Sequence, residues 1–273
     1  MKLDQVGIWS EIKLEIIKEY ASAYTKIMSS QSWCKGYVYI DAFAGAGKHI
    51  SKQSGEMIQG SPLNALEVEP PFTEYHFIDL DEERADVFRR MAKKNPNVHA
   101  YHGDCNEILK TKIFPALTYN SRKRALCILD PYGLHLKWET IKAAAELKTI
   151  DIFINFSIQD ANRNVLFEDL ARAKPEDIER MNAFWGDESW KELLYREQET
   201  FFGETRQVRI EDYQILSKEF CMRLKRVGFN DAPEPILMRN KKGGPLYYLC
   251  FASQKNVAKN IVNDIFDKYR RAY

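Results

Sequence analysis

The chain has 273 residues, of which 45% are hydrophobic and 29% charged, so its composition is that of a globular protein and not of a collagen-like or disordered one. Its 40 Lys and Arg residues are balanced by 39 Asp and Glu residues, which excludes a strongly basic coat protein that binds any nucleic acid. Five dispersed cysteines without a C-x-x-C pair argue against a disulfide framework or a cysteine zinc site. Because no apolar leader or long apolar span is present, we expect a cytoplasmic protein.

The first predicted elements are a long helix and a strand that ends in a glycine-bearing turn. Residues 10–32 carry apolar side chains at spacings of three and four, which predicts an amphipathic helix with Ser10 as its N-cap. The β-branched and aromatic run YVYIDAF predicts a strand, and AGAGK follows it. A strand that breaks into a Gly-rich turn typically begins the ligand crevice of an α/β domain.

Helices and strands then alternate. Ser61 and Pro62 predict an N-cap and a first helical position, and hence a short helix over 62–68. Further strands are predicted at EYHFID, NVHAYHGD, RALCILD and DIFINFS, with helices over 81–94, 106–114 and 137–147 between them. Pro115 should end the helix over 106–114. The alternation predicts an α/β fold with a Rossmann-like, doubly wound and mostly parallel sheet.

The last part of the chain is predicted to hold an insertion and the end of the sheet. Residues 159–210 are rich in charged and aromatic residues, with helical spacing over 175–185 and 189–202, so we expect a helical insertion or lid over the strand ends. Later elements are a helix over 211–227 closed by Gly228, an antiparallel strand pair at 234–239 and 245–253, and a helix over 256–269. The expected division is therefore a core with its N-terminal helix over 1–158, the insertion over 159–210, and completion of the core over 211–273.

The turn DAFAGAGK lacks two familiar phosphate-binding patterns. A Walker-type loop needs a glycine where Ala42 stands, and a dinucleotide fingerprint needs a third glycine where Ile50 stands. What remains is an acid followed by Gly45 and Gly47. Glycines let the backbone approach a ligand closely, and Asp41 can hold an ammonium or hydroxyl group. A tight turn without a ligand is the alternative.

Acidic residues also follow the next two strands. Asp79 is the first polar residue after its apolar run, where it is placed to hold ribose hydroxyls, whereas Asp81 is expected to cap the following helix. Asp104 ends the third strand and is a candidate for accepting from an adenine amino group, or alternatively for an N-cap. Three acids at the ends of successive strands together indicate a polar ligand site.

The fourth strand ends in Asp130, Pro131, Tyr132 and Gly133, which places an acid and an aromatic ring over the same crevice. This pair suits a planar amine, because the ring can stack while the carboxylate and a carbonyl receive the N–H protons. Asp-Pro-x-Gly is also good turn chemistry, and both interpretations can hold together. Weaker candidates near the crevice are His49, His135 and Arg163.

The order of these motifs resembles class I S-adenosylmethionine-dependent methyltransferases. More narrowly, nearly the whole chain resembles the bacterial three-Cys-motif partner family. The segments that carry this resemblance are KLEIIKEYASAY, YIDAFAGAG, GSPLNAL, YHFIDLD, LDPYGL, Trp138 with IDIFINFS, and FWGDESW.

The resemblance implies S-adenosylmethionine as the cofactor. The methyl transfer that it implies requires no metal. The residues expected to bind the cofactor are Asp41, Phe43, Gly45, Gly47, Asp79 and Asp104. Asp130, Pro131 and Tyr132 would be catalytic, with the acid polarising the attacking amine, the Pro131 carbonyl helping and the ring stacking. DPYG is similar to the Asp-Pro-Phe/Tyr-Gly motif of tRNA N2-guanine dimethyltransferases, which points to an exocyclic amine of a nucleobase. The family resemblance also implies a partner protein with a three-cysteine motif of the radical-type iron–sulfur class.

We therefore predict a methyltransferase that modifies nucleic acid, and two other functions remain open. The first is a non-catalytic partner or scaffold that keeps the fold, because the near-neutral charge and the aromatic residues of the insertion also fit a protein interface. Those aromatic residues are Phe184, Trp185, Trp190, Phe201 and Phe202. The second is methylation of a small molecule, which requires the insertion to close a compact pocket.

Overall fold

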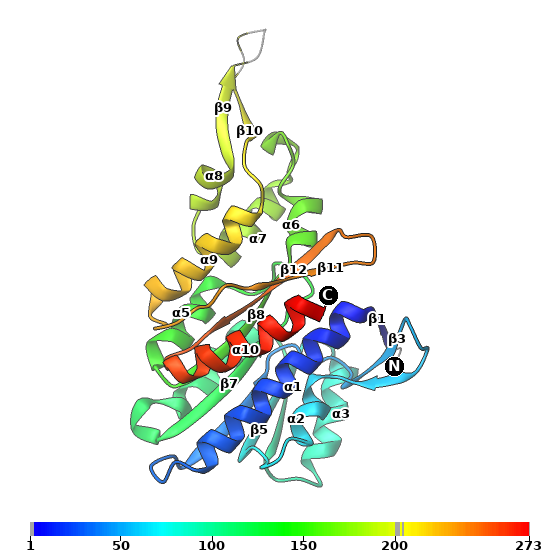
Figure 1. The fold of residues 1–273 in the computed structure, drawn as a ribbon, viewed down its shortest axis with the longest axis vertical. Coiled ribbons are helices and arrows are strands. Elements are labelled where there is room, and N and C mark those ends of the chain that lie inside the picture. Colours follow the sequence, from blue (N-terminus) through cyan, green and yellow to red (C-terminus); the bar gives the residue numbers. More distant parts are fainter. Residues whose placement is uncertain (1–2, 200–202, 204, 273) are drawn as a thin grey trace.

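The computed structural model describes residues 3–199, 203 and 205–272, with a central sheet between two layers of helices (Figure 1). The sheet contains β2 (Gly36–Asp41), β5 (Glu74–Asp79), β6 (Val98–His102), β7 (Lys123–Leu129), β8 (Ile150–Phe156), β11 (Ile236–Arg239) and β12 (Pro245–Ala252). Their order is β11-β12-β8-β7-β2-β5-β6. Neighbours from β8 to β6 pair in parallel, whereas β12 is antiparallel to β8 and to β11. This confirms the predicted Rossmann-like fold and its closing antiparallel strand pair.

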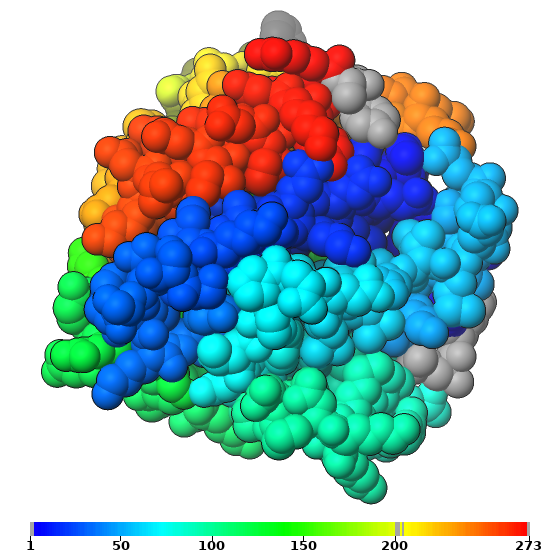
Figure 2. All heavy atoms as spheres, turned by 60° about the horizontal axis from the view of Figure 1, so that its bottom comes forward, coloured from blue at the N-terminus to red at the C-terminus, as the bar shows by residue number. Residues whose placement is uncertain are grey.

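Both faces of the sheet are buried. In β2, Val38 and Ile40 face one hydrophobic cluster and Tyr39 faces the other, and all three are 0% exposed. The Tyr39 side is covered by α1 (Ile8–Ser29), α2 (Ser61–Leu66), α3 (Glu82–Ala92) and α10 (Asn256–Ala272). The other side is covered by α4 (Cys105–Ile108), α5 (Trp138–Leu147), α6 (Ile158–Asn164), α7 (Pro175–Trp185), α8 (Ser189–Leu194) and α9 (Gln214–Val227). Figure 2 shows α1, in dark blue, between α10 in red and the cyan segment that includes α2. No helix in the described ranges is long and apolar enough to cross a membrane.

Two serine caps predicted from the sequence are wrong. Helix α1 begins at Ile8 with Gly7 at its N-cap, so Ser10 lies inside the first turn. Helix α2 begins at Ser61 itself, after Gly60. The Ser61 hydroxyl donates to Asp41 at the end of β2, so this side chain links the start of α2 to the sheet.

The chain also stays helical past Pro115, where we predicted a stop. Helix α4 continues as a π-helical turn over Leu109–Ile113 and a 3₁₀ turn over Phe114–Leu117. Pro115 lies in the first turn of that 3₁₀ segment, where its fixed φ suits the start of a helical turn.

A small second sheet, which the sequence did not predict, joins the N-terminus to the segment after the glycine-bearing turn. Strand β3 (Lys48–Ser51) pairs in parallel with β1 (Asp4–Val6) and antiparallel with β4 (Met57–Gln59). Only Ser51 is buried among these strand residues. Because the strands are short and largely exposed, they leave no apolar alternation by which to recognise them.

The helix predicted over 189–202 is wrong beyond α8. After Leu194 the chain extends as β9 (Tyr195–Glu199), which pairs antiparallel with β10 (Thr205–Arg209) in a hairpin that projects from the end of the molecule (Figure 1). In β9 only Tyr195 is buried, so the segment has no apolar stripe with which a helix could pack. The predicted aromatic positions Phe201 and Phe202 lie outside the described residues.

The other aromatic residues of the insertion belong to the core. Phe184, Trp185 and Trp190 are 0% exposed. The ring of Phe184 stacks on Phe220 of α9, with centroids 5.4 Å apart, and Phe220 also packs on Phe156 of β8. These side chains therefore tie α7 and α8 to the sheet and present no open aromatic surface.

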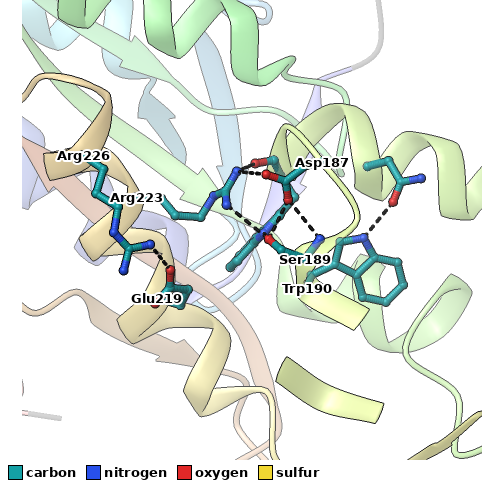
Figure 3. A network of polar contacts seen from close by, with 8 residues as sticks. Asp187, Ser189, Trp190, Glu219, Arg223 and Arg226 are labelled. Atoms are coloured by element: carbon teal, nitrogen blue, oxygen red, sulfur yellow. Dashed lines mark hydrogen bonds and ion pairs between the residues drawn. The ribbon is translucent and has the colours of Figure 1, made fainter. Parts of the chain in front are cut away.

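Arg223 of α9 holds the same region together through polar contacts (Figure 3). Its guanidinium donates to the Trp185 carbonyl at 2.8 Å, the Asp187 carboxylate at 2.8 Å and the Ser189 hydroxyl at 3.2 Å. It also lies 5.0 Å from the ring centroid of Trp138 and 5.1 Å from that of Trp185. The Arg223 side chain is 14% exposed and that of Asp187 is 50% exposed, so the contact with the Trp185 carbonyl is better shielded from water than the ion pair.

We expect Arg223→Met to lower the free energy of unfolding by about 2–3 kcal/mol, because it leaves the Trp185 carbonyl without its donor and removes the cation from the rings of Trp138 and Trp185. Arg226→Met is the matched control on the same helix. Arg226 pairs with Glu219 but is 63% exposed, so its loss should change stability by no more than about 0.5 kcal/mol. Urea unfolding of the two variants measures both values, and equal effects would contradict the role given to Arg223.

Candidate functional site

A cavity of about 450 Å³ lies at the carboxyl ends of β2, β7 and β8. Its wall is formed by the turn after β2, the Asp-Pro-Tyr segment after β7, the end of β8 and the N-terminal residues 4–14. Five of the residues predicted for the site line it: Phe43, Gly45, Asp130, Pro131 and Tyr132. Four others, Asp41, Gly47, Asp79 and Asp104, are not among its lining residues.

The two glycines of the turn do different things. Gly45 has a φ of 62°, and a Cβ added there would meet no atom within 4 Å, so its backbone faces the open cavity. Gly47 has a φ of 73°, but an added Cβ would lie 3.3 Å from the Phe88 ring of α3 and 3.5 Å from Leu63. Gly45 therefore leaves room for a ligand, whereas Gly47 lets the turn pack closely on α2 and α3.

Asp79 and Asp81 fix this turn and the start of α3. The Asp79 carboxylate accepts from the Gly45 N–H at 2.7 Å with one oxygen and from the Asp81 N–H at 2.8 Å with the other. The Asp81 side chain accepts from the Arg84 N–H, so its predicted role as an N-cap is confirmed. Asp79 is thus one hydrogen bond away from the cavity wall.

Asp104 adopts the alternative that the sequence left open. It is the N-cap of α4 and accepts from the Asn106 backbone N–H at 2.8 Å and side-chain amide at 2.9 Å. The residue is exposed at the carboxyl end of β6. A role toward adenine stays a prediction for Asp104.

Asp41 is fully buried behind the turn. Its carboxyl group accepts from the Phe43 N–H at 3.2 Å and from the Ser61 hydroxyl. Burial raises the pKa of Asp41 to about 7, and the nearby Asp130 adds to the rise. Asp41 therefore shapes the turn from behind and does not reach the cavity.

Asp130 is held by two side chains that sequence analysis did not single out. The Lys13 ammonium of α1 donates to Oδ2, and the Asn155 amide of β8 donates to Oδ1 at 2.7 Å. Lys13 is only 8% exposed and lies 5.2 Å from the ring centroid of Tyr247. The burial of Lys13 could have been predicted from the helix pattern, because Lys13 lies on the face that also carries Ile16 and Ile17.

Tyr132 connects the site to the N-terminal strand. Its ring is exposed, its hydroxyl donates to the Asp4 carboxylate at 2.7 Å, and it accepts from Arg84 at 3.1 Å. Arg84 also pairs with Asp4 at 3.0 Å. Neither Asp4 nor Arg84 carried a recognisable motif, because their contacts with Tyr132 join residues that are far apart in the chain.

Two buried polar atoms of the cavity wall have no hydrogen-bond partner among the described residues, Asn155 Oδ1 and His49 Nδ1. Burial and the charge of Lys13 lower the pKa of His49, so its ring is neutral at neutral pH. The other weak candidates, His135 and Arg163, are exposed and do not line the cavity.

Comparison with known proteins does not place the chain in a family. No family model matches the chain. No curated protein matches it either. Among solved structures, the chain is similar to a putative S-adenosylmethionine-dependent methyltransferase from Listeria monocytogenes (13% sequence identity, covering 87% of this chain and 99% of that chain, TM-score 0.39). It is also similar to an S-adenosylmethionine-dependent methyltransferase from Clostridium acetobutylicum (12% identity, 88% and 92% covered, TM-score 0.38) and to the trans-methyltransferase CalH in complex with SAH (15%, 86% and 57%, TM-score 0.40).

With identities and TM-scores this low, these similarities do not decide the activity. The fold assignment rests on the strand order itself. The resemblance to the three-Cys-motif partner family stays a prediction.

The buried acid gives a pH-dependent stability. Because the pKa of Asp41 is raised from 3.8 to about 7, the folded protein keeps a proton that the unfolded chain releases, so the free energy of unfolding falls as pH rises from about 4 to about 7. The slope for one such group is at most about 1.4 kcal/mol per pH unit. Asp41→Asn removes it, and urea unfolding at about pH 5 and pH 7 should therefore show a steeper loss in the wild type. Equal slopes would mean that Asp41 is ionised in the folded protein.

Proposed function

We propose that the chain is an S-adenosylmethionine-dependent methyltransferase whose acceptor is an exocyclic amine of a nucleobase in nucleic acid. The main support is that one cavity joins the backbone around Gly45 with Asp130, Pro131 and Tyr132. Donor and acceptor need such a shared space, because in-line transfer requires the attacking atom about 3 Å from the methyl carbon. A position at the carboxyl ends of parallel strands is also where ligands of this fold class bind.

The donor, which supplies a methyl group on a sulfonium, fits the turn after β2. Gly45 offers bare backbone beside open space, and Phe43 supplies apolar wall next to it. Asp79 keeps the turn in place, and each of its oxygens retains a lone pair for ribose hydroxyls. Asp41 contributes indirectly, by holding the Phe43 N–H and α2.

The acceptor amine fits the opposite wall. Each oxygen of Asp130 already accepts one bond and can accept a second from an amine N–H. The unpartnered Asn155 Oδ1 and the carbonyl of Pro131 are further acceptors at this wall. As the amine attacks, positive charge develops on its nitrogen, and a nearby carboxylate stabilises that charge. Lys13 is a positioning residue, because it fixes the Asp130 carboxylate without touching the reacting atoms.

A nucleobase can reach this wall only when it is out of the base stack. The exposed ring of Tyr132 offers a surface for stacking at the mouth of the cavity. Lys52 is exposed and also lines the cavity, where it suits a backbone phosphate. Nucleic acid therefore fits the site better than a small neutral amine does.

A second candidate is a non-catalytic scaffold for a three-cysteine-motif partner, and one observation favours it. Both oxygens of Asp130 are engaged by Lys13 and Asn155, so the charge of Asp130 is neutralised without a substrate. A scaffold would keep this arrangement for stability alone. Donor binding and methyl transfer distinguish the two functions.

Calorimetric titration with S-adenosylmethionine and S-adenosylhomocysteine tests the donor site. The wild type should bind both, and Asp79→Ala should weaken binding about tenfold or more, roughly the effect of losing one hydrogen bond to a charged group. Asp81→Ala is the matched control, since it removes only the cap of α3. A wild type that binds neither ligand would leave the scaffold as the better proposal.

Transfer of a labelled methyl group to tRNA and DNA tests the acceptor side. Asp130→Ala should lower the rate about 100-fold or more, because the group that stabilises the developing charge is lost. Its donor affinity should stay at the wild-type value, which also verifies that the variant is folded. Full transfer by Asp130→Ala would exclude Asp130 from catalysis.

A further inference from the structure

A group of three side chains at the far end of the sheet has the composition of a metal site. Glu74 and His76 lie on β5 and His99 on β6, near the amino ends of these strands and away from the cavity. One ligand atom from each lies within 4.8 Å of the other two. In the parallel register His76 pairs with His99, and Glu74 projects from the same face two residues earlier.

The orientation of His76 suits a ligand. Its Nδ1 is 3.1 Å from the Tyr101 hydroxyl, which leaves Nε2 directed at Glu74, 3.6 Å from Oε2. Metal-bound histidines are commonly held in this way, by a hydrogen bond at the second ring nitrogen. The rings of His76 and His99 lie nearly parallel, with centroids 4.9 Å apart.

The Glu74 carboxylate also offers one oxygen to the group. Lys123 bonds to Oε1 and leaves Oε2, the oxygen nearest to His76.

We infer that Glu74, His76 and His99 form a binding site for a divalent transition metal, with Zn²⁺ as the first candidate. Two imidazoles and one carboxylate are a common zinc ligand set and leave a fourth position for water. Metal–ligand bonds of about 2.0–2.1 Å need the three atoms closer together than they are, and rotation of the exposed His99 side chain can supply that movement.

The bound ion would join the edge strand β6 to β5 through side chains. Among the described strands, β6 pairs only with β5, so a link across this pair strengthens the edge of the sheet. The site does not depend on the proposed methyltransferase activity, because it shares no residue with the cavity.

Titration of the chelator-treated full chain with Zn²⁺ tests the inference. The wild type should bind one equivalent, and Zn²⁺ should raise its melting temperature. His99→Ala should weaken zinc binding roughly 10–100-fold or more, since removing a ligand costs at least as much as removing its supporting partner. His102→Ala is the matched control on the same strand and should bind as the wild type does. His99 is exposed, so its replacement leaves the fold intact.

Glu74→Gln provides the second variant, and it too should bind Zn²⁺ more weakly. Equal zinc affinities of Glu74→Gln and the wild type would show that Glu74 is not a ligand, and would overturn the three-residue site. Absence of saturable zinc binding by the wild type would also overturn the site. An equal loss of zinc affinity in His99→Ala and His102→Ala would overturn it too, because it would indicate adsorption to surface histidines. Because donor binding is measured separately, failure here leaves the proposed function unaffected.

Discussion

Burial of the parallel strands on both faces is the constraint on which the rest of the molecule depends. Residues such as Val38, Tyr39 and Ile40 are 0% exposed, so a polar side chain within these strands would lack water on either side. Polar groups are therefore concentrated where strands end. Since β2, β7 and β8 run in the same direction, their carboxyl ends meet, and a polar cavity forms there.

That cavity depends in turn on charges that neutralise one another. Lys13 is 8% exposed and would be costly to bury alone, but it lies against Asp130, which Asn155 also holds. Removing one partner of a fully buried pair typically costs about 3–5 kcal/mol, because the other charge is left unpaired, and the 26% exposure of the Asp130 side chain makes the cost smaller here. The pair thus fixes the start of α1 over the end of β7, and the N-terminal residues become part of the site.

The sequence predicts those elements whose burial produces a local pattern of apolar residues. EYHFID and RALCILD were recognised because buried strands leave apolar runs, and Asp79 and Asp130 because parallel strands bring their ends together. The strands β1, β3, β9 and β10 were missed, since they are held by backbone pairing and little apolar burial. Their local residues therefore gave no periodic signal.

Contacts between distant parts of the chain account for what sequence analysis missed in the two sites. Lys13 meets Asp130 across 117 positions and Asp4 meets Tyr132 across 128, and no local spacing encodes either contact. His76 and His99 likewise become neighbours only through the register of β5 and β6. The one local indication was that Lys13 lies on the apolar face of its helix, with Ile16 and Ile17.

The pattern of unpaired groups in the cavity limits which ligand suits it. Lys13 is matched by Asp130 and Arg84 by Asp4, so these two cations are already neutralised. Among the described residues, two buried polar atoms of the cavity wall have no partner, and the one beside Asp130 is the acceptor Asn155 Oδ1. A ligand that brings N–H groups satisfies this atom and the remaining lone pairs of Asp130, whereas an anionic group placed beside Asp130 would face that carboxylate, and the described cations Lys13 and Arg84 are already paired. The interior is therefore suited to an amine, and the exposed Lys52 leaves the rim suited to a phosphate.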